Sequence, residues 1–297
     1  MRHYGLIGEK LGHSLSRPIH EAIFAHAGID ADYRIIEIPR DRFTQEAEGL
    51  LASLDGFNIT IPYKQDIMPL LDAVDPLADA IGAVNTVVCG EKRGFNTDAA
   101  GFMGMLQHYG IDVAGAPHCF ILGSGGTMKT VRACLKEMGA KGVTVVSRHP
   151  GAAPEVGQGP TNAGHCSQCP SVASAASTVM AGVDEISYAD FYERFPQIGG
   201  LIVNASAAGM WPRKDPDNIC AIHPDRVDEM MRYATGVADV VYNPPQTFLT
   251  QAAAKAGKPW CTGLYMLVAQ AVEAEAIWQD RKMPAGLVEK IMQEVHL

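Results

Sequence analysis

The fold of this chain is decided by residues 118–149, which read HCFILGSGGTMKTVRACLKEMGAKGVTVVSRH. Residues 118–122 form an apolar run typical of a buried strand, and a glycine-rich turn at 123–126 follows directly. Residues 127–138 have apolar side chains at helical spacing, and residues 142–147 are the next expected strand. A strand, a glycine-rich turn, a helix and a second strand in this order predict a Rossmann-like unit that binds a dinucleotide.

The glycine-rich turn brings backbone N–H groups to a helix N-terminus, where the positive end of the helix dipole favours a pyrophosphate. Gly123 permits the tight turn, and Gly125 lets the backbone approach the phosphates. Met128 stands where the usual fingerprint has a further glycine, so the motif is incomplete. We predict cofactor contacts at Gly123, Ser124, Gly125, Gly126 and Thr127.

The end of the following strand decides which nicotinamide cofactor fits. A cofactor without a 2′-phosphate usually meets Asp or Glu there, whereas this chain has Ser147, Arg148 and His149. Arg148 can make charge-assisted hydrogen bonds to a 2′-phosphate. The sequence therefore favours NADP, with NAD as the alternative if Arg148 is a solvated surface residue.

Strands and helices also alternate on both sides of this unit. Before it, the pattern predicts strands at 4–7, 33–38 and 56–60 and helices at 18–27 and 41–53, with a largely parallel sheet. A linking helix is expected at 102–109, strands at 201–204 and 236–241, and helices at 248–256, 263–279 and 285–295. Residues 150–182 have little periodicity and are expected to be a loop or a weak helix.

Charge and composition narrow the class of partner. The 297 residues have a net charge of −9, which disfavours nucleic acid and anionic membrane surfaces. No signal peptide is evident, and no apolar stretch approaches the about 20 residues that span a bilayer. Seven scattered Cys favour a reducing compartment. We expect a cytoplasmic protein whose partners are small molecules.

A metal site is not expected. His165, Cys166 and Cys169 supply at most half of a tetrahedral zinc site, and the sequence shows no second pair of ligands. His13 and His20 are expected to make hydrogen bonds in a loop and a helix rather than to bind metal.

Six segments in a fixed order carry a more specific signal. They are GLIGEKLGHSLS (5–16), NITIPYK (58–64), GAVNT (82–86), GFNTDAAGF (94–102), DVVYNP (239–244) and GLYMLVAQ (263–270). Together with the glycine-rich turn, this set closely resembles the shikimate dehydrogenase family, including its quinate-using members. The resemblance spans the chain except for about 150–182.

The resemblance implies two α/β domains with a cleft between them. Residues 1–100, completed by the C-terminal helices of 247–297, would bind the substrate, and residues 101–246 would form the Rossmann-like NADP-binding domain. The implied reaction is the reversible NADP-linked reduction of 3-dehydroshikimate to shikimate, on the chorismate pathway to aromatic amino acids. A relative that uses NAD, quinate or another cyclohexane acid and a non-catalytic ligand-binding relative are the alternatives, and a monomer or homodimer is expected.

Two residues of the matched segments suit the chemistry. Reducing a ketone leaves an alkoxide that must receive a proton, and Lys64 can supply it. The resemblance places Asp98 beside Lys64, where it would also accept a hydrogen bond from a substrate hydroxyl. Which of the two carries the proton stays open, because close acid–base pairs titrate jointly. Both are intact, which argues against a non-catalytic relative.

The other matched positions suit a polyhydroxylated acid, which needs short and fixed donors and acceptors. The resemblance assigns Ser14 and Ser16 to the substrate carboxylate, Thr60, Asn85 and Gln270 to the ring hydroxyls, and Tyr242 to the cleft near the nicotinamide or the carboxylate. It assigns Ala205, Met210 and Gly263 to the nicotinamide end of the cofactor.

One position departs from the family pattern next to the carboxylate-binding serines. Arg17 intervenes between Ser16 and Pro18, where the family has Pro directly. Its cation either adds to carboxylate binding, and so changes which acid is preferred, or points to solvent.

Overall fold

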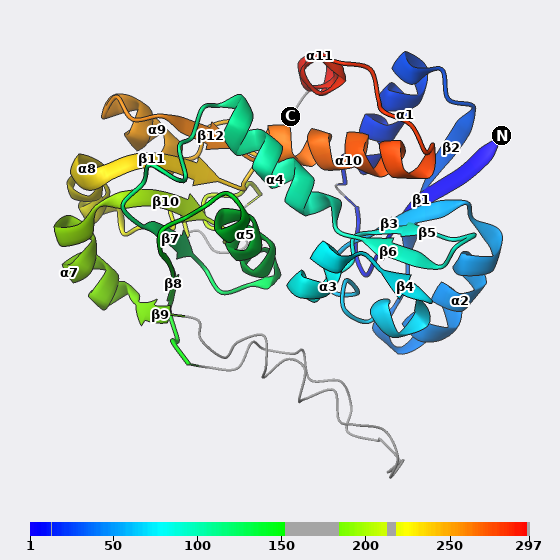
Figure 1. The fold of residues 1–297 in the computed structure, drawn as a ribbon, viewed down its shortest axis with the longest axis horizontal. Helices are drawn as coiled ribbons and strands as arrows, with labels where there is room; N and C mark the ends of the chain where they lie inside the picture. Colours follow the sequence, from blue (N-terminus) through cyan, green and yellow to red (C-terminus); the bar gives the residue numbers. More distant parts are fainter. Residues whose placement is uncertain (13, 152–183, 213–217, 296–297) are drawn as a thin grey trace, which may run out of the picture.

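The protein consists of two α/β lobes, each built on a six-stranded sheet (Figure 1). The computed structural model describes residues 1–12, 14–151, 184–212 and 218–295. The prediction of a loop or weak helix for 150–182 therefore falls almost wholly outside the described residues, as do His13, His165, Cys166 and Cys169. The predicted fold class, two α/β domains of which one is Rossmann-like, is confirmed.

The sheet of the first lobe is mixed. Its strand order is β2-β1-β3-β5-β6-β4. The strands are β1 (Arg2–Gly8), β2 (Ala31–Glu37), β3 (Gly56–Ile59), β4 (Ala73–Val74), β5 (Thr86–Val88) and β6 (Arg93–Phe95). The prediction of a largely parallel sheet holds for β2-β1-β3 and is wrong for β5, which runs antiparallel to both of its neighbours.

The helices of the first lobe flank this sheet. They are α1 (Ser16–Ala27), α2 (Phe43–Ser53) and α3 (Pro76–Ile81), with short 3₁₀ turns η1 (Arg40–Arg42) and η2 (Met68–Leu70). The predicted helices at 18–27 and 41–53 correspond to α1 and α2, whereas α3 has only six residues and was not predicted.

The sheet of the second lobe has the order β12-β11-β10-β7-β8-β9, and every neighbouring pair is parallel. Its strands are β7 (Cys119–Leu122), β8 (Val143–Ser147), β9 (Asp184–Ser187), β10 (Gly200–Asn204), β11 (Ala234–Asp239) and β12 (Trp260–Thr262). Its helices are α5 (Gly126–Glu137), α7 (Tyr188–Ile198), α8 (Pro224–Tyr233) and α9 (Phe248–Lys255). The strand β7, the glycine-rich turn, α5 and β8 follow one another as predicted.

Side chains of β7 show why this strand is apolar along its whole length. Cys119 and Ile121 pack into one core, and Phe120 and Leu122 pack into the core on the opposite face. A parallel strand covered on both faces needs apolar residues at every position. The apolar run Cys119–Leu122 therefore suits β7 to its position between β10 and β8 in the interior of the second sheet.

Two helices join the lobes. The helix α4 (Thr97–His108) crosses from the first lobe to the second and packs along α10 (Leu264–Trp278) (Figure 1). Their close approach depends on Gly101, where a Cβ would lie 2.6 Å from the backbone oxygen of Met266. The last helix, α11 (Leu287–Glu294), packs on α10 and α1.

The predicted domain division needs one correction. Residues from 247 onward were assigned to the first domain, but β12 pairs with β11, and α9 packs against both strands of the second sheet. β12 has three residues, Trp260–Thr262, all of which pair with β11, and α9 lies between these two strands in the chain. The C-terminal part of the first lobe therefore begins with α10.

The described residues contain neither a membrane-spanning helix nor a cluster of metal ligands. None of the helices in the described ranges is both long and apolar enough to cross a bilayer. In the same ranges, no three His, Cys, Asp or Glu side chains gather closely enough to bind a metal ion.

Candidate active site

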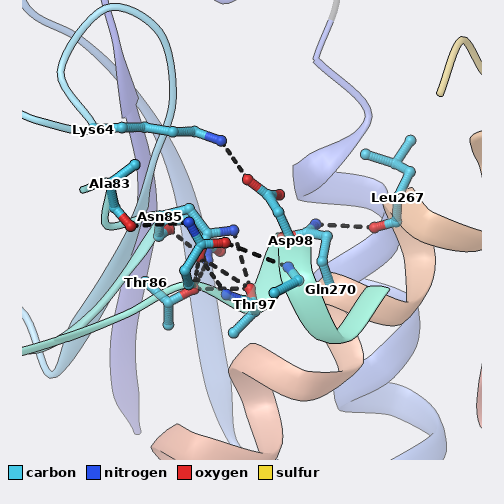
Figure 2. Close-up of polar contacts among 11 residues, drawn as sticks. Lys64, Ala83, Asn85, Thr86, Thr97, Asp98, Leu267 and Gln270 are labelled. Atoms are coloured by element: carbon cyan, nitrogen blue, oxygen red, sulfur yellow. Dashed lines mark hydrogen bonds and ion pairs between the residues drawn. The ribbon is translucent and has the colours of Figure 1, made fainter. Parts of the chain in front are cut away.

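Lys64 and Asp98 form an ion pair at the junction of β3 and α4. Lys64 Nζ donates to Asp98 Oδ2 at 2.5 Å, although the residues are 34 positions apart in the chain (Figure 2). Both side chains remain partly accessible, with exposed fractions of 27% for Lys64 and 19% for Asp98. The pair can therefore exchange protons with a bound molecule and with solvent.

The turn that carries Lys64 is anchored on both sides. The preceding residue, Tyr63, is fully buried, stacks on Phe43 and donates its hydroxyl to the backbone oxygen of Ile38 at 2.5 Å. The backbone oxygen of Lys64 accepts from the N–H of Val84 at 2.8 Å. The amino group is thus presented from a fixed backbone.

Asp98 lies in the first turn of α4, and this helix begins earlier than predicted. The predicted linking helix covered 102–109, whereas α4 begins at Thr97 because Asn96 caps it, accepting from the N–H of Ala99 at 3.3 Å. Asp98 is therefore the second residue of α4. The positive end of the helix dipole stabilises its carboxylate there.

Asn85 lies beside this pair, and its side chain is engaged by the start of α4 (Figure 2). Asn85 Oδ1 accepts from the N–H of Thr97 at 2.7 Å, and Asn85 Nδ2 donates to Thr97 Oγ1 at 3.1 Å. Asn85 is buried. The structure thus gives Asn85 a positioning role for Asp98; its expected contact with a ring hydroxyl stays a prediction.

Residues behind Asn85 were missed by the sequence analysis. Asn58 is buried in β3, accepts from the Tyr33 hydroxyl at 2.7 Å and donates to Thr86 Oγ1 at 3.0 Å. Thr86 Oγ1 in turn contacts Thr97 Oγ1 at 3.1 Å. The signal available in the sequence was an amide within the otherwise apolar strand Gly56–Ile59.

Ser14 and Ser16 lie together at the N-terminus of α1. Ser14 Oγ donates to Ser16 Oγ at 3.1 Å and accepts from the Ser16 N–H at 3.2 Å. The N-cap residue, Leu15, has no side chain that can satisfy the first N–H groups of the helix. Two hydroxyls and a helix N-terminus make this end of α1 suited to a carboxylate.

Arg17 does not share that arrangement. Its Nε donates to Glu21 Oε1 at 2.8 Å on the surface of α1, and its side chain is 60% exposed. Of the two alternatives for Arg17, the structure favours the one in which it faces solvent.

The remaining expected substrate contacts come from three further elements. Gln270 lies on α10 beside Asp98 and donates from Nε2 to the backbone oxygen of Leu267 at 2.9 Å (Figure 2). Thr60 follows β3 and donates its N–H to the Ile7 backbone oxygen at 2.9 Å. Tyr242 follows β11 and is partly buried, which raises the pKa of its hydroxyl.

The glycine-rich turn fits a dinucleotide. Gly123 has a φ of +104°, and a Cβ there would lie 2.8 Å from Ser206 Cβ, so both conformation and space require glycine. At Gly125 and Gly126 nothing lies within 4 Å of an added Cβ, and the N-cap of α5 has no side-chain partner. The turn therefore leaves open space beside the first backbone N–H groups of α5, those of Gly126 and Thr127.

The end of β8 carries Ser147 and Arg148, the two residues expected to distinguish NADP from NAD. Ser147 Oγ is buried and, among the described residues, has no hydrogen-bond partner. A buried hydroxyl without a partner is costly, and a ligand hydroxyl would satisfy it. Arg148 follows Ser147 in the chain and is exposed.

Asn204 and Asp239 fix the loops after β10 and β11. Asn204 Nδ2 donates to Asp239 Oδ1 at 2.8 Å, and Asn204 Oδ1 accepts from the Ser206 N–H at 3.0 Å. Asp239 also accepts from Thr247 Oγ1 at 2.7 Å and from the Val241 N–H at 3.0 Å. Burial raises the pKa of Asp239 to about 6, against the lowering effect of these hydrogen bonds.

The three residues expected near the nicotinamide all follow strands of the second sheet. Ala205 is buried after β10, Met210 is 36% exposed in the same loop, and Gly263 follows β12. A Cβ at Gly263 would lie 2.0 Å from the Val240 backbone oxygen, so only glycine permits this approach. The carboxyl ends of parallel strands are where α/β sheets bind ligands.

A cavity of about 220 Å³ lies between α3 of the first lobe and α5 of the second. It is lined by Ala80, Ile81, Met128, Lys129, Arg132, Ala133 and Lys136. Its lining includes neither Lys64 nor Asp98, so it is separate from the ion pair. The cleft expected to hold the substrate is therefore not this cavity.

Comparisons with known proteins agree with the geometry. Residues 6–87 match the family model described as shikimate dehydrogenase substrate binding domain. The chain is 32% identical over 295 residues to the shikimate dehydrogenase (NADP(+)) of Clostridium beijerinckii, covering 97% of each protein. It also matches the crystal structure of a chorismate mutase/shikimate 5-dehydrogenase fusion protein from Clostridium acetobutylicum, with a TM-score of 0.80 and 31% identity, over 99% of this chain and 97% of that one.

A further solved structure was determined with ligands. It is shikimate 5-dehydrogenase from Thermus thermophilus in complex with NADP(H) and shikimate, with a TM-score of 0.74 and 26% identity over 99% of both chains. The resemblance inferred from the six sequence segments is confirmed over nearly the whole chain. This chain belongs to the shikimate dehydrogenase family.

Proposed function

We propose that this protein is a shikimate dehydrogenase that reversibly reduces 3-dehydroshikimate to shikimate with NADPH. The observation that carries the proposal is the partly exposed ion pair between Lys64 and Asp98. This pair belongs to the first lobe, and the glycine-rich turn proposed to bind the dinucleotide belongs to the second. Support comes from relatives named shikimate dehydrogenase (NADP(+)) and from the related structure with NADP(H) and shikimate.

Proton transfer is the step that the protein's own residues perform. Bound NADPH would supply the hydride to the carbonyl carbon. As negative charge develops on the carbonyl oxygen, Lys64 donates a proton from its ammonium group and is left as a neutral amine. Asp98 accepts a hydrogen bond from Lys64 and holds the ammonium group in place. Lys64 then recovers a proton from solvent, to which it is partly exposed.

We assign substrate recognition to polar side chains on the helices and loops that surround the Lys64–Asp98 pair. In this proposal Ser14 and Ser16 donate to the substrate carboxylate from the start of α1. Thr60, Asn85 and Gln270 contact the ring hydroxyls, and Asp98 accepts from a substrate hydroxyl. Tyr242 would line the cleft from the second lobe.

The cofactor would extend along the carboxyl edge of the second sheet. Residues 123–127 would hold the pyrophosphate, Ser147 a ribose hydroxyl, and Arg148 the 2′-phosphate that distinguishes NADP from NAD. Ala205, Met210 and Gly263 would surround the nicotinamide. In this proposal the first lobe with α10 and α11 is the substrate domain, and the second lobe is the NADP-binding domain.

We also propose that the enzyme works in the cytoplasm as a monomer or homodimer. Within the described ranges Cys89, Cys119, Cys134, Cys220 and Cys261 are free thiols, and all but Cys220 are buried. Free thiols are typical of a reducing compartment. Light scattering of the purified protein would measure the oligomeric state.

The function is tested by following NADPH absorbance with the purified protein. Shikimate and quinate are each paired with NADP⁺ and NAD⁺, and shikimate with NADP⁺ is expected to give the highest kcat/KM. Faster turnover of quinate, or a preference for NAD⁺, would contradict the assigned substrate or cofactor. Binding of both ligands without turnover would establish the non-catalytic alternative.

A further inference from the structure

A histidine and a glutamate are paired in the interior of the first lobe. His20 on α1 and Glu275 on α10 are both fully buried, and His20 Nδ1 lies 2.7 Å from Glu275 Oε1. Glu275 Oε2 also accepts from Gln279 Nε2 at 3.1 Å. The contact joins residues 255 positions apart.

Packing alone does not account for this pair. Replacing both partners of a buried hydrogen bond by apolar side chains of the same shape can be nearly neutral or stabilising. His20 Nε2 is also buried and, in the part of the chain that the structure describes, has no hydrogen-bond partner. Two apolar residues would join α1 to α10 without these costs, which points to a role beyond stability.

The two helices carry residues of the proposed acid-binding site. Ser16 begins α1, and His20 lies one helical turn after it on the same face. Gln270 lies on α10, the helix of Glu275. The His20–Glu275 contact therefore fixes how the serine pair and Gln270 stand relative to each other.

The His20 ring also contacts a second group of residues behind the site, Tyr33 and Asn58. It stacks on the Tyr33 ring with centroids 4.0 Å apart and an interplanar angle of 9°. Tyr33 donates its hydroxyl to Asn58 Oδ1 at 2.7 Å. Burial, and to a lesser extent the negative charge of Glu275, raise the pKa of Tyr33 well above its usual value, so this hydroxyl stays protonated and remains a donor.

Asn58 connects Tyr33 to the start of α4, where Asp98 lies. It donates to Thr86 Oγ1, which contacts Thr97 Oγ1, and Thr97 is the residue before Asp98. The chain of contacts from Glu275 through His20 and Tyr33 to Asn58 thus lies behind the acid-binding half of the site. Its members lie on α1, β2, β3 and α10, none of which belongs to the second lobe.

We propose that His20 and Glu275 are positioning residues for the acid substrate, an inference that rests on the proposed shikimate dehydrogenase function. The Glu275 carboxylate fixes the Nδ1–H form and the plane of the His20 ring. The ring then holds α1 with its serines, and Tyr33 with Asn58, in the arrangement that binds the acid.

The test compares Glu275→Leu, Glu275→Gln and Tyr33→Phe with the wild-type enzyme. Glu275→Leu removes the acceptor of His20, and we expect KM for shikimate to rise about 10-fold, the size of one buried hydrogen bond. KM for NADP⁺ should stay within about 2-fold, and kcat should fall by a smaller factor than KM rises. Glu275→Gln keeps an acceptor oxygen and should restore most of the shikimate affinity.

A matched control is available on the same helix. His26 Nε2 lies 2.8 Å from Glu294 Oε1, which joins α1 to α11, but Glu294 is 47% exposed. Glu294→Leu should leave KM for shikimate unchanged. An equal rise in that variant would show that any loosening of α1 has the same effect, and would overturn the inference.

Tyr33→Phe keeps the test decisive if Glu275→Leu does not fold. It removes one oxygen atom and keeps the ring stacked on His20, and it should raise KM for shikimate without changing KM for NADP⁺. Unchanged shikimate KM in the folded variants, or equal changes for both substrates, overturns the positioning role while the proposed function stands. A wild-type enzyme that does not oxidise shikimate overturns the proposed function and this inference with it.

Discussion

The side-chain oxygen of Asn85 accepts a hydrogen bond from the backbone N–H of Thr97 at 2.7 Å. This contact ties the loop after α3 to the first turn of α4, and it therefore determines where Asp98 stands. Lys64 is tied to the same loop, because its backbone oxygen accepts from the Val84 N–H at 2.8 Å. One short loop thus fixes both members of the proposed proton-transfer pair.

Lys64→Ala should lower kcat by a factor of roughly 10² to 10⁴, the usual contribution of a positioned acid or base. KM for shikimate should change much less, because the carboxylate and most ring hydroxyls are assigned to other residues. Steady-state kinetics measures both, with Lys290→Ala on the exposed face of α11 as the control. Normal turnover in Lys64→Ala would mean that another group supplies the proton.

Arg148→Ala should weaken NADP by about 1.5–3 kcal/mol, the range of a hydrogen bond to a charged group. Affinity for NAD should stay nearly the same, because NAD has no 2′-phosphate. Calorimetric titration of both cofactors gives the comparison, and Arg232→Ala on α8 serves as a charge-matched control. The assignment fails if both cofactors lose affinity equally or if the wild type prefers NAD.

Asp239 should make the stability of the protein depend on pH. Burial raises its pKa in the folded state to about 6, from 3.8 in an unfolded chain. The folded state therefore favours the protonated form, so this contribution is full below pH 3.8 and is lost as the pH rises through 6. At about 1.4 kcal/mol for each pH unit, the loss is on the order of 3 kcal/mol.

Asp239→Asn removes this titration and tests it. The free energy of unfolding of the variant, relative to wild type, should increase by about 2 kcal/mol between pH 4 and pH 6.5, because part of the titration lies below pH 4. Urea denaturation at a series of pH values measures it. Asp72→Asn, at an exposed carboxylate, is the control. A difference between Asp239→Asn and wild type that is constant with pH would show that Asp239 does not titrate in this window.

The sequence predicted the centre of the second lobe well. The expected strands at 118–122 and 142–147 differ from β7 and β8 by one residue each. Both strands have apolar side chains on two covered faces, so the local pattern carries the information. In contrast, β4, β5 and β6 have only two or three residues, and neighbouring strands determine them rather than any periodicity.

The prediction of the candidate site relied more on the resemblance to a known family than on the spacing of residues in the sequence. No spacing rule connects Lys64 with Asp98, because the turn after β3 and the start of α4 meet only in the folded lobe. The same holds for Tyr33 and Asn58: the amide within β3 marks Asn58 as unusual, but nothing in the sequence pairs it with Tyr33, 25 positions away. Long-range contacts of this kind require the fold to be known first.

Ser14→Ala combined with Ser16→Ala should raise KM for shikimate at least about 10-fold and spare affinity for NADP. Each hydroxyl is worth about 1 kcal/mol net, or somewhat more toward a charged partner. The two hydroxyls lie 3.1 Å apart at the uncapped start of α1, and the dinucleotide turn lies on the other lobe. Ser53→Ala is the control, because the Ser53 hydroxyl on α2 is exposed and donates to the Gly49 backbone oxygen of its own helix.

A neutral methyl ester of shikimate separates carboxylate binding from general damage. The ester has no negative charge for the serines to bind, so its kcat/KM should change little between wild type and the double variant, whereas the free acid should lose most of its kcat/KM. Equal losses for ester and acid would show that these serines do not bind the carboxylate. Arg17 would then be the better candidate, and its pairing with Glu21 at 2.8 Å would have to break when the acid binds.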